Sequence, residues 1–504
     1  MTVVQNRAMN PTLSLWLRLL AGPAAAIILY LLFPETVGSG ATALSVSHEA
    51  RLTLAAAVWM GSWWLLEPVH VSITALLPLV LFPMLGIASM KAAAAPYAQE
   101  MVFLFLGGFI IAEAMQQTGL HHRVANFILV RAGRRMDRLV LAVMAATALI
   151  SMWVSNAATA SMMLPVALGL VHTAERSDGI DSRESAAFAG SLTMGVAYAA
   201  TIGGLATMLG TAPNVFAAAY LRNELNSSIT FGQWLIFGVP LAALFLPIAW
   251  WVITRWVIKV APKPIAEVRR EVVTGDAGQR FTIVVFATAV VLWVSRPFVA
   301  ELSVGSIKPF ASLSDGWIAM AAAMALWTIP VVADKDRDGR ARRRPLLDGR
   351  SIRTLPWDVL LLFGGGFSLA AALDTHKVGD LLGAVAGSFA GAPPLLVLTV
   401  VAALVIGVGE FASNTAMTAA AVPVMAGLAA GLHMDPVTLV ITTTLAASCS
   451  FALPVGTPPN AIAYGAGRFT VGQMARAGLI LDTVGVVLVV AAAWLLIPLA
   501  LSTP

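Results

Sequence analysis

Long apolar segments follow one another along almost the whole chain, and they constrain its fold more than any other feature. A first segment at 13–33 is followed by others at about 51–67, 70–87, 101–118, 137–174, 186–222, 234–258, 281–300, 315–333, 354–373, 379–432, 437–467 and 477–500. A membrane-spanning helix needs about 20 mostly apolar residues. Only 11% of the residues are charged, whereas soluble domains carry roughly 25%. We therefore predict an all-α polytopic protein of the inner or plasma membrane, with the first segment retained as a helix.

Basic residues gather in three of the loops between these segments. The loops hold Arg123, Arg131, Arg134, Arg135 and Arg138; Lys259, Lys263, Arg269, Arg270 and Arg280; and Lys335, Arg337, Arg340, Arg342, Arg343, Arg344, Arg350 and Arg353. Lys and Arg favour the cytoplasmic side of a membrane. We expect these loops and the N-terminus to be cytoplasmic, and the loops near Glu35, Glu224 and Glu301 to lie outside. The net charge of +5 therefore reflects topology and lipid contact, and we expect no nucleic-acid partner.

Two segments, 137–174 and 379–432, are too long for one span, and each has a polar break in its middle. All three basic loops fall on the cytoplasmic side only if each of these segments leaves the membrane on the face by which it entered. We interpret both as re-entrant helical hairpins. The prediction is then about eleven full spans plus two hairpins, with the C-terminus outside.

The two hairpins belong to an internal repeat. Ser155-Asn156 and Pro165 recur 258 positions later, and so do the Gly-Gly-Phe residues at 107–109. Gly210-Thr211-Ala212-Pro213-Asn214 returns 246 positions later as Gly456-Thr457-Pro458-Pro459-Asn460. The predicted topology makes the repeats inverted. Inverted repeats with interrupted helices are typical of secondary transporters whose site lies near the membrane midplane.

The interruptions can bind ions and anions through their backbone. Proline removes a donor and ends a helix, and unpaired backbone inside a membrane must face protein or a water-filled cavity. Helix N-termini favour anions, while carbonyl and hydroxyl oxygens favour small cations. The motifs contain no Lys, Arg or His, so co-bound cations would have to offset the charge of an anionic substrate. Glu410, about one turn before the second Ser-Asn, is expected to brace the hairpin, with proton binding as the alternative.

Other functional classes find little support in the sequence. No H-E-x-x-H, Walker, G-x-S-x-G or C-x-x-C pattern is present, so neither an enzyme nor an ATP-driven pump is expected. A membrane-embedded enzyme would rest on Glu113 and Glu410 alone, and a receptor would not need paired hairpins. His121 and His122 adjoin Arg123 and are expected to be solvated, while Cys449 is expected to be a small core residue.

The stretches SMWVSNAATASMMLP (151–165), GEFASNTAMTAAAVP (409–423) and SCSFALPVGTPPN (448–460) resemble the divalent anion–sodium symporter family, which includes sodium–dicarboxylate and sodium–citrate cotransporters. The resemblance covers roughly residues 50–500. It implies an elevator-type homodimer that transports succinate, malate or fumarate with Na⁺ and uses no organic cofactor. It also implies scaffold parts at 1–118 and 233–373, and transport parts at 119–232 and 374–504.

Residue roles follow from the same resemblance. One sodium site would use Ser151, Ser155, Asn156 and the backbone of Gly210, and the second would use Asn414 and backbone carbonyls near Gly409, Ala412 and Gly456. The substrate would contact Ser155, Asn156, Ala157, Thr211, Ser413, Asn414, Thr415, Thr457 and Pro458. Three positions depart from the family pattern, because Ala157 and Gly409 stand where Thr is expected and Ala212 stands where Pro is expected. Ala157 removes a hydroxyl from the substrate site. A sodium-independent 2-oxoglutarate/malate exchanger and a carrier of citrate or sulfate remain alternatives.

Overall fold

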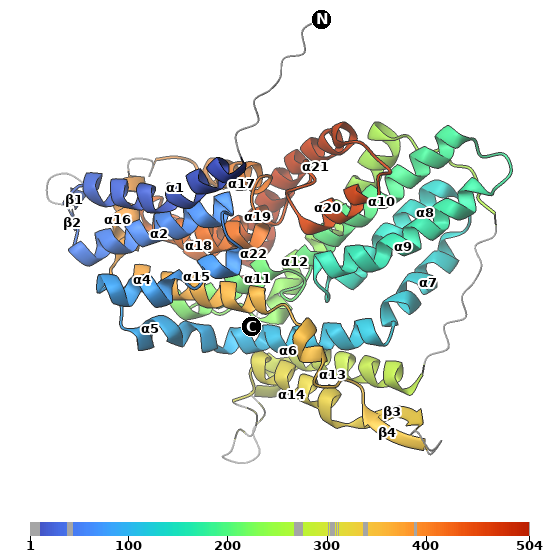
Figure 1. Cartoon of the computed structure of the whole chain (residues 1–504), viewed down its shortest axis with the longest axis horizontal. Helices are drawn as coiled ribbons and strands as arrows, with labels where there is room; N and C mark the ends of the chain where they lie inside the picture. The colour runs from blue at the N-terminus through green and yellow to red at the C-terminus, as the bar shows by residue number, and fades with distance from the viewer. Residues whose placement is uncertain are drawn as a thin grey trace, which may run out of the picture. The chain divides into compact units, whose positions relative to one another are not determined.

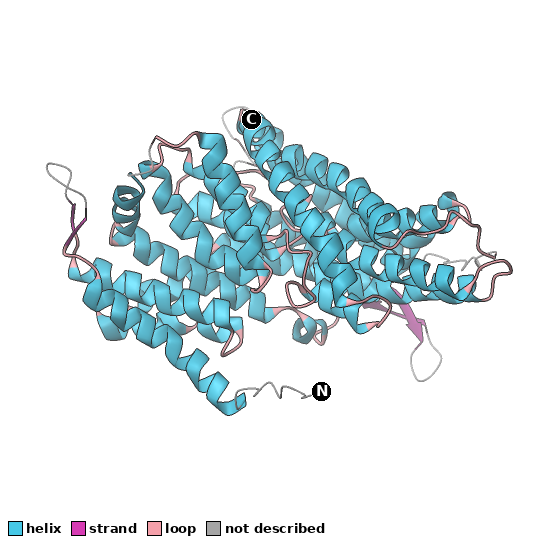
Figure 2. Cartoon of the chain, turned by 90° about the horizontal axis from the view of Figure 1, so that it is seen from above, coloured by secondary structure: helices cyan, strands magenta, loops and turns pink. Residues whose placement is uncertain are grey.

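The computed structural model describes residues 11–37, 44–266, 276–300, 302, 308, 310, 312–335, 341–387 and 391–502. Five residues of the predicted loops lie outside this part of the chain, namely Arg269, Arg270, Glu301, Arg337 and Arg340. Figure 2 shows that the described chain is almost entirely helical, with strands confined to two short hairpins. The predicted all-α architecture is therefore confirmed.

The helices of the first half are α1 (Pro11–Leu32), α2 (His48–Leu66), α3 (Val71–Thr74), α4 (Leu77–Leu85), α5 (Met90–Ala94), η2 (Ala95–Ala98), α6 (Glu100–Gln117), α7 (Leu120–Ala132), α8 (Met136–Ser151), α9 (Asn156–Glu175), α10 (Ser182–Leu205), α11 (Ala212–Glu224), α12 (Phe231–Trp251) and η3 (Val252–Val257). Those of the second half are α13 (Ala277–Ala300), α14 (Asp315–Thr328), η4 (Ser351–Thr354), α15 (Trp357–Thr375), α16 (Val378–Ala386), α17 (Pro394–Gly409), α18 (Asn414–Gly431), α19 (Pro436–Ala447), α20 (Pro458–Gly465), α21 (Val471–Ala491), η6 (Ala492–Leu496) and α22 (Ile497–Leu501). The strands are β1 (Thr36–Val37) with β2 (Leu44–Ser45), and β3 (Pro330–Lys335) with β4 (Ala341–Pro345).

Eight helices of the described chain are long and apolar enough to cross a membrane, and three shorter apolar helices accompany them. Many large apolar side chains on these helices face outward, such as Leu31 on α1 and Leu404 on α17. Outward apolar side chains suit lipid, because the bilayer interior solvates them and water does not. The number of crossings and the side on which each loop lies stay predictions.

The chain forms two compact units. One comprises residues 1–99, 357–393 and 415–440, and in it α1 packs on α2 while α15 packs on α3 and η2. The other comprises residues 100–356, 394–414 and 441–504 and holds most of the predicted site residues. In this second unit α10 packs against α8, α9, α12 and α20, and α6 packs against α14 (Figure 1). The predicted scaffold and transport boundaries stay a prediction.

Both predicted kinds of break occur. The first hairpin turns between α8 and α9, where Ser155 caps the new helix by accepting a hydrogen bond from the N–H of Ala158. The segment 186–222 is interrupted between α10 and α11, and the segment 437–467 between α19 and α20. Thr211 and Thr457 stand at the N-caps of the second pieces, and proline lies in the first turn of each. Proline fits a first turn, whose N–H groups have no helical partner.

The repeat extends further than its motifs. Thr230 and Gln233 form a capping box at the start of α12, and Thr470 and Gln473 form the same box 240 positions later at α21. Each helix then ends in a π-helical segment, η3 or η6, and these segments also begin 240 positions apart. The last long helix of each half is therefore built alike from start to finish.

Four features differ from expectation. The segment 70–87 is split into α3 and α4, and 379–432 contains α16 before the two helices of the hairpin. The third basic loop includes the β3–β4 hairpin, in which Asp334 pairs with Arg342. His122 is exposed as expected, but the prediction for His121 is wrong, because its ring is buried against that of His122 at 4.1 Å between centroids.

Candidate functional site

The first hairpin and the first helix break meet at Asn156. The hydroxyl of Ser151, at the end of α8, donates to Oδ1 of Asn156 at 2.9 Å. The same amide lies against Gly204, where an added Cβ would come within 2.5 Å of Asn156 Oδ1. Gly210 in turn contacts the carbonyl of Gly204, since a Cβ at 210 would come within 2.5 Å of that oxygen. The structure therefore brings Ser151, Asn156 and Gly210 together, and glycine at 204 makes room for the amide.

Asn214 holds this break in shape. Its Nδ2 donates to the carbonyls of Gly204 and Thr207, both at 2.8 Å. Of the two atoms at the end of the amide group, only the nitrogen donates hydrogen bonds, so these bonds also fix the orientation of the side chain. Its Oδ1 is buried and has no hydrogen-bond partner among the described residues. The unwound backbone is thus fixed by one side chain rather than left to adapt.

The second hairpin and the second break repeat this arrangement with different residues. Gly409, at the end of α17, lies against Ser450, whose hydroxyl would be 3.0 Å from a Cβ at 409. Gly456 lies beside Glu410, because a Cβ at 456 would be 3.3 Å from its backbone oxygen and from Oε2. Ala412 is buried and its N–H donates to the carbonyl of Gly409 at 3.3 Å. Gly409 and Ala412 are therefore hydrogen-bonded to each other, and Gly456 lies beside the next residue, Glu410. That these residues bind sodium stays a prediction.

Asn460 braces the second break as Asn214 braces the first. Its Nδ2 donates to the carbonyls of Ser450 and Leu453, each at 3.1 Å. These residues stand 246 positions after Gly204 and Thr207, so the same two carbonyls are held in both repeats. Oδ1 of Asn460 is likewise buried without a partner in the part of the chain that is described. The motifs indicated a break here but did not reveal this brace.

The predicted residues divide by exposure. Five of the eight expected sodium ligands are buried, namely Ser151, Gly210, Gly409, Ala412 and Gly456, and the other three are also expected substrate contacts. The expected substrate contacts are mostly open: Ser155 and Pro458 are exposed, Asn156, Ala157, Thr211, Ser413, Asn414 and Thr415 are half-buried, and Thr457 is buried. Within the second unit, α20 packs against both α9 and α10, so the first hairpin and the two breaks converge. Thr415 is the first residue of its segment in the other unit.

The predicted site residues offer oxygens and N–H groups and include no Lys, Arg or His. The N-terminal ends of α9 and α11 present backbone N–H groups, which favour an anion. The buried carbonyls and hydroxyls favour a small cation. An anion and cations bound together would offset each other's charge where protein replaces water.

Residues 14–501 match the family described as the sodium:sulfate symporter transmembrane region. The chain belongs to this family. The "sodium-dependent dicarboxylate transporter SdcS" of Staphylococcus saprophyticus is 31% identical over 492 residues, which cover 95% of this chain and 91% of that protein. The protein of the same name from Staphylococcus aureus (strain bovine RF122 / ET3-1) is 30% identical, covering 90% of this chain and 87% of its own length.

Solved structures share the fold at low identity. The YdaH transporter of Alcanivorax borkumensis matches with a TM-score of 0.54 and 14% identity, over 96% of this chain and 98% of that one. MtrF of Neisseria gonorrhoeae matches with a TM-score of 0.52 and 12% identity, over 97% and 95%. This sodium:sulfate symporter family member is therefore a multi-pass membrane transporter and not an enzyme, as the sequence predicted.

Sequence reasoning missed Asp482 of α21. Its side chain and that of Glu410 border the same cavity, and its Oδ1 accepts from the N–H of Phe451 at 3.1 Å. Glu410 accepts from the N–H groups of Ala452 at 2.9 Å and Leu453 at 2.8 Å. The expectation that Glu410 has a bracing role is confirmed, but the segment that it ties to the hairpin is the second break. An acidic side chain in the middle of a long apolar helix was a signal in itself, but the sequence could not show which residues Asp482 contacts.

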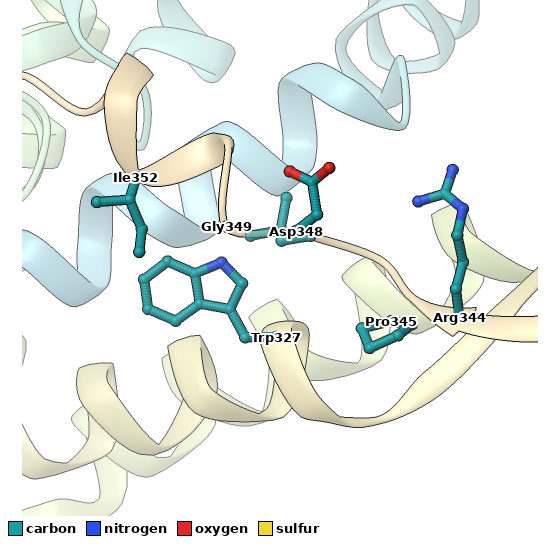
Figure 3. Close-up of a pocket in the computed structure, with 7 residues that line it drawn as sticks. Trp327, Arg344, Pro345, Asp348, Gly349 and Ile352 are labelled. Atoms are coloured by element: carbon teal, nitrogen blue, oxygen red, sulfur yellow. The ribbon is translucent and has the colours of Figure 1, made fainter.

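Two cavities of this symporter family member lie near polar groups. One, of about 600 Å³, lies between α17 and α21 and is bordered by Ile406, Glu410, Leu453, Leu479 and Asp482. The other, of about 530 Å³, lies between the end of α14 and η4 (Figure 3). Trp327, Arg344, Asp348 and Ile352 line it, and the indole N–H of Trp327 donates to Ser351 at 3.0 Å. Neither cavity is lined by the predicted substrate contacts.

Proposed function

We propose that this chain is a secondary active transporter that moves C4 dicarboxylates such as succinate, malate and fumarate together with Na⁺. The observation that carries the proposal is the doubled break braced by Asn214 and Asn460. Two preformed groups of buried oxygens suit two cations, and the open hydroxyls and helix N-termini beside them suit carboxylates. The names of the relatives, which are sodium-dependent dicarboxylate transporters, agree with this choice.

The proposed ligands are those of the resemblance. Na⁺ would bind at Ser151, Ser155, Asn156 and Gly210, and at Gly409, Ala412, Asn414 and Gly456. The carboxylates would contact the more open set around Ser155, Asn156, Thr211, Ser413, Asn414, Thr415, Thr457 and Pro458, with Ala157 beside them. Because no cationic side chain stands in these motifs, substrate binding would depend on Na⁺.

The proposed mechanism is of the elevator type. The hairpins and breaks would move as one body past a fixed scaffold, and a homodimer in the inner or plasma membrane would hold that scaffold still. The N-terminus would be cytoplasmic. The bonds from Glu410 to Ala452 and Leu453 favour such motion, because they tie a hairpin to its break and keep the site intact while it moves.

The test is uptake of labelled succinate into proteoliposomes containing the purified chain. One set is given an inward Na⁺ gradient, a second has none, and a third is preloaded with unlabelled malate or 2-oxoglutarate. Accumulation in empty vesicles that requires the Na⁺ gradient is the expected result. Uptake restricted to preloaded vesicles and indifferent to Na⁺ would instead identify an exchanger.

Sulfate or citrate transport is the second candidate, favoured by one observation. Ala157 leaves the substrate side of the first hairpin without the expected hydroxyl, and the family description names sulfate. Labelled sulfate and citrate in the same vesicles test this alternative. Sodium-driven uptake of either anion with none of succinate would replace the dicarboxylate proposal.

A further inference from the structure

In both repeats the hairpin contacts the helix break, but the serine hydroxyl at this contact comes from the hairpin in the first repeat and from the break in the second. In the first repeat the hairpin residue is Ser151 and the break residue is Gly204. The positions that correspond to them, 258 and 246 residues later, are Gly409 and Ser450. The hydroxyl that the hairpin supplies in the first repeat is therefore supplied by the break in the second.

The geometry of the second repeat gives this exchange a function. The hydroxyl oxygen of Ser450 is 3.0 Å from the point where a Cβ on Gly409 would be. It therefore fills the space that a hydroxyl residue on the hairpin would use. The Ser450 side chain is fully buried, with 0% of its surface exposed.

The Ser450 hydroxyl has no hydrogen-bond partner among the described residues. Its backbone carbonyl is already held by Asn460 at 3.1 Å, so the hydroxyl alone is unused. A buried polar atom without a partner is destabilising, and in native proteins a bound ion is one of the ordinary reasons for such an atom. The neighbouring Gly409 ends α17, and carbonyl oxygens at the end of an interrupted helix are of the kind that hold a small cation.

We propose that Ser450 is a ligand of the second sodium site and replaces the hydroxyl that Gly409 lacks. The inference rests on the proposed sodium symport and assigns a residue that neither the motifs nor the resemblance indicated. It also explains why glycine at 409 is compatible with a complete site. The oxygen is retained and only its point of attachment to the chain has changed.

The experiment measures the Na⁺ dependence of succinate uptake in proteoliposomes, and Na⁺-induced thermal stabilisation of the purified protein without substrate. Ser450→Ala should raise the Na⁺ concentration for half-maximal effect about tenfold in both assays, as expected for losing one bond to a charged group. Ser450→Cys keeps the shape but replaces a hard oxygen by sulfur, so it should show a similar loss. Ser191→Ala is the matched control, since Ser191 on α10 is also buried without a partner in the described chain.

A pair of substitutions can move the hydroxyl from the break back to the hairpin. Gly409→Ser alone should impair the protein, because its side chain would crowd Ser450. Gly409→Ser combined with Ser450→Ala should restore most of the Na⁺ affinity. An unchanged Na⁺ dependence in Ser450→Ala, or an equal loss in Ser191→Ala, would overturn the inference and leave sodium symport standing. Wild-type uptake that ignores Na⁺ would overturn the proposed function, and the inference with it.

Discussion

At the scale of single residues, Asn156 and Asn414 occupy equivalent positions directly after the two hairpin turns. Asn156 accepts from Ser151 at 2.9 Å and contacts Gly204, so it links the hairpin to the break. We expect Asn156→Ala and Asn414→Ala each to abolish uptake while the protein remains folded. Uptake assays paired with size-exclusion chromatography check this, and normal uptake by either variant would mean that the site lies elsewhere.

The bracing residues Asn214 and Asn460 give a prediction about the order of thermal stability among variants. Replacing either by Ala removes two hydrogen bonds to break carbonyls, which costs about 2 kcal/mol at about 1 kcal/mol each. Asp should be worse than Ala, because its oxygens would face those carbonyls without a donor between them. Thermal unfolding in detergent should therefore rank Asn above Ala and Ala above Asp at both positions. A variant in which Asp equals Asn would show that the amide nitrogen is not the bonding group.

We expect a substitution at Ala157 to change which anion is preferred. It follows Asn156 in the first turn of α9 and is half-buried. Ala157→Thr restores a hydroxyl, which can discriminate between anions by offering one more hydrogen bond. We expect the ratio of succinate to sulfate uptake to change several-fold while the Na⁺ dependence stays near wild type. Competition assays measure both, and an unchanged ratio would show that position 157 does not face the substrate.

At the scale of elements, the predicted cytoplasmic ends of α8 and η3 are joined by Asp137. Its carboxylate is buried and pairs with Arg135 at 2.9 Å and Arg255 at 3.0 Å. Its carbonyl also accepts from the indole of Trp250 at 2.9 Å. Asp137→Ala removes charge-assisted hydrogen bonds from two half-exposed arginines and should lower stability by about 2 kcal/mol.

The control for Asp137 is Glu175, whose ion pairs with His172 and Arg468 lie at the surface. Glu175→Ala should cost less than about 1 kcal/mol, because exposed ion pairs contribute little. Thermal unfolding of both variants makes the comparison. Equal losses would show that Asp137 stabilises no more than a surface pair does.

Some structural elements could be predicted from the sequence and others could not. The breaks were predictable because proline and a capping Thr act on their own local backbone, as at Thr457 and Pro458. The β3–β4 hairpin was not, because its arginines suggest a loop and its register is defined only once the two strands pair. Ser450 and Asp482 were also missed, since each matters only through residues brought close by folding. Features set by local sequence could therefore be predicted, whereas contacts between distant segments could not.

At the scale of the whole molecule, the predicted topology places the loop after α7 inside the cell and the loop after α11 outside. The chain has one cysteine, Cys449, which is buried, so Cys449→Ala gives a background free of thiols. In that background we expect Arg131→Cys to resist a membrane-impermeant maleimide in intact cells and Ser228→Cys to react. Permeabilised cells serve as the control, in which both should react. The opposite labelling pattern would invert the whole topology.

The contact between positions 409 and 450 also has a consequence for sequences other than this one. Three ångströms separate the Ser450 oxygen from where a side chain at 409 would begin, so there is room for one hydroxyl there and not for two. Relatives should therefore change at the two positions together. Where Ser or Thr stands at the first, a residue as small as Ala or Gly should stand at the second, and chains carrying hydroxyls at both should be rare.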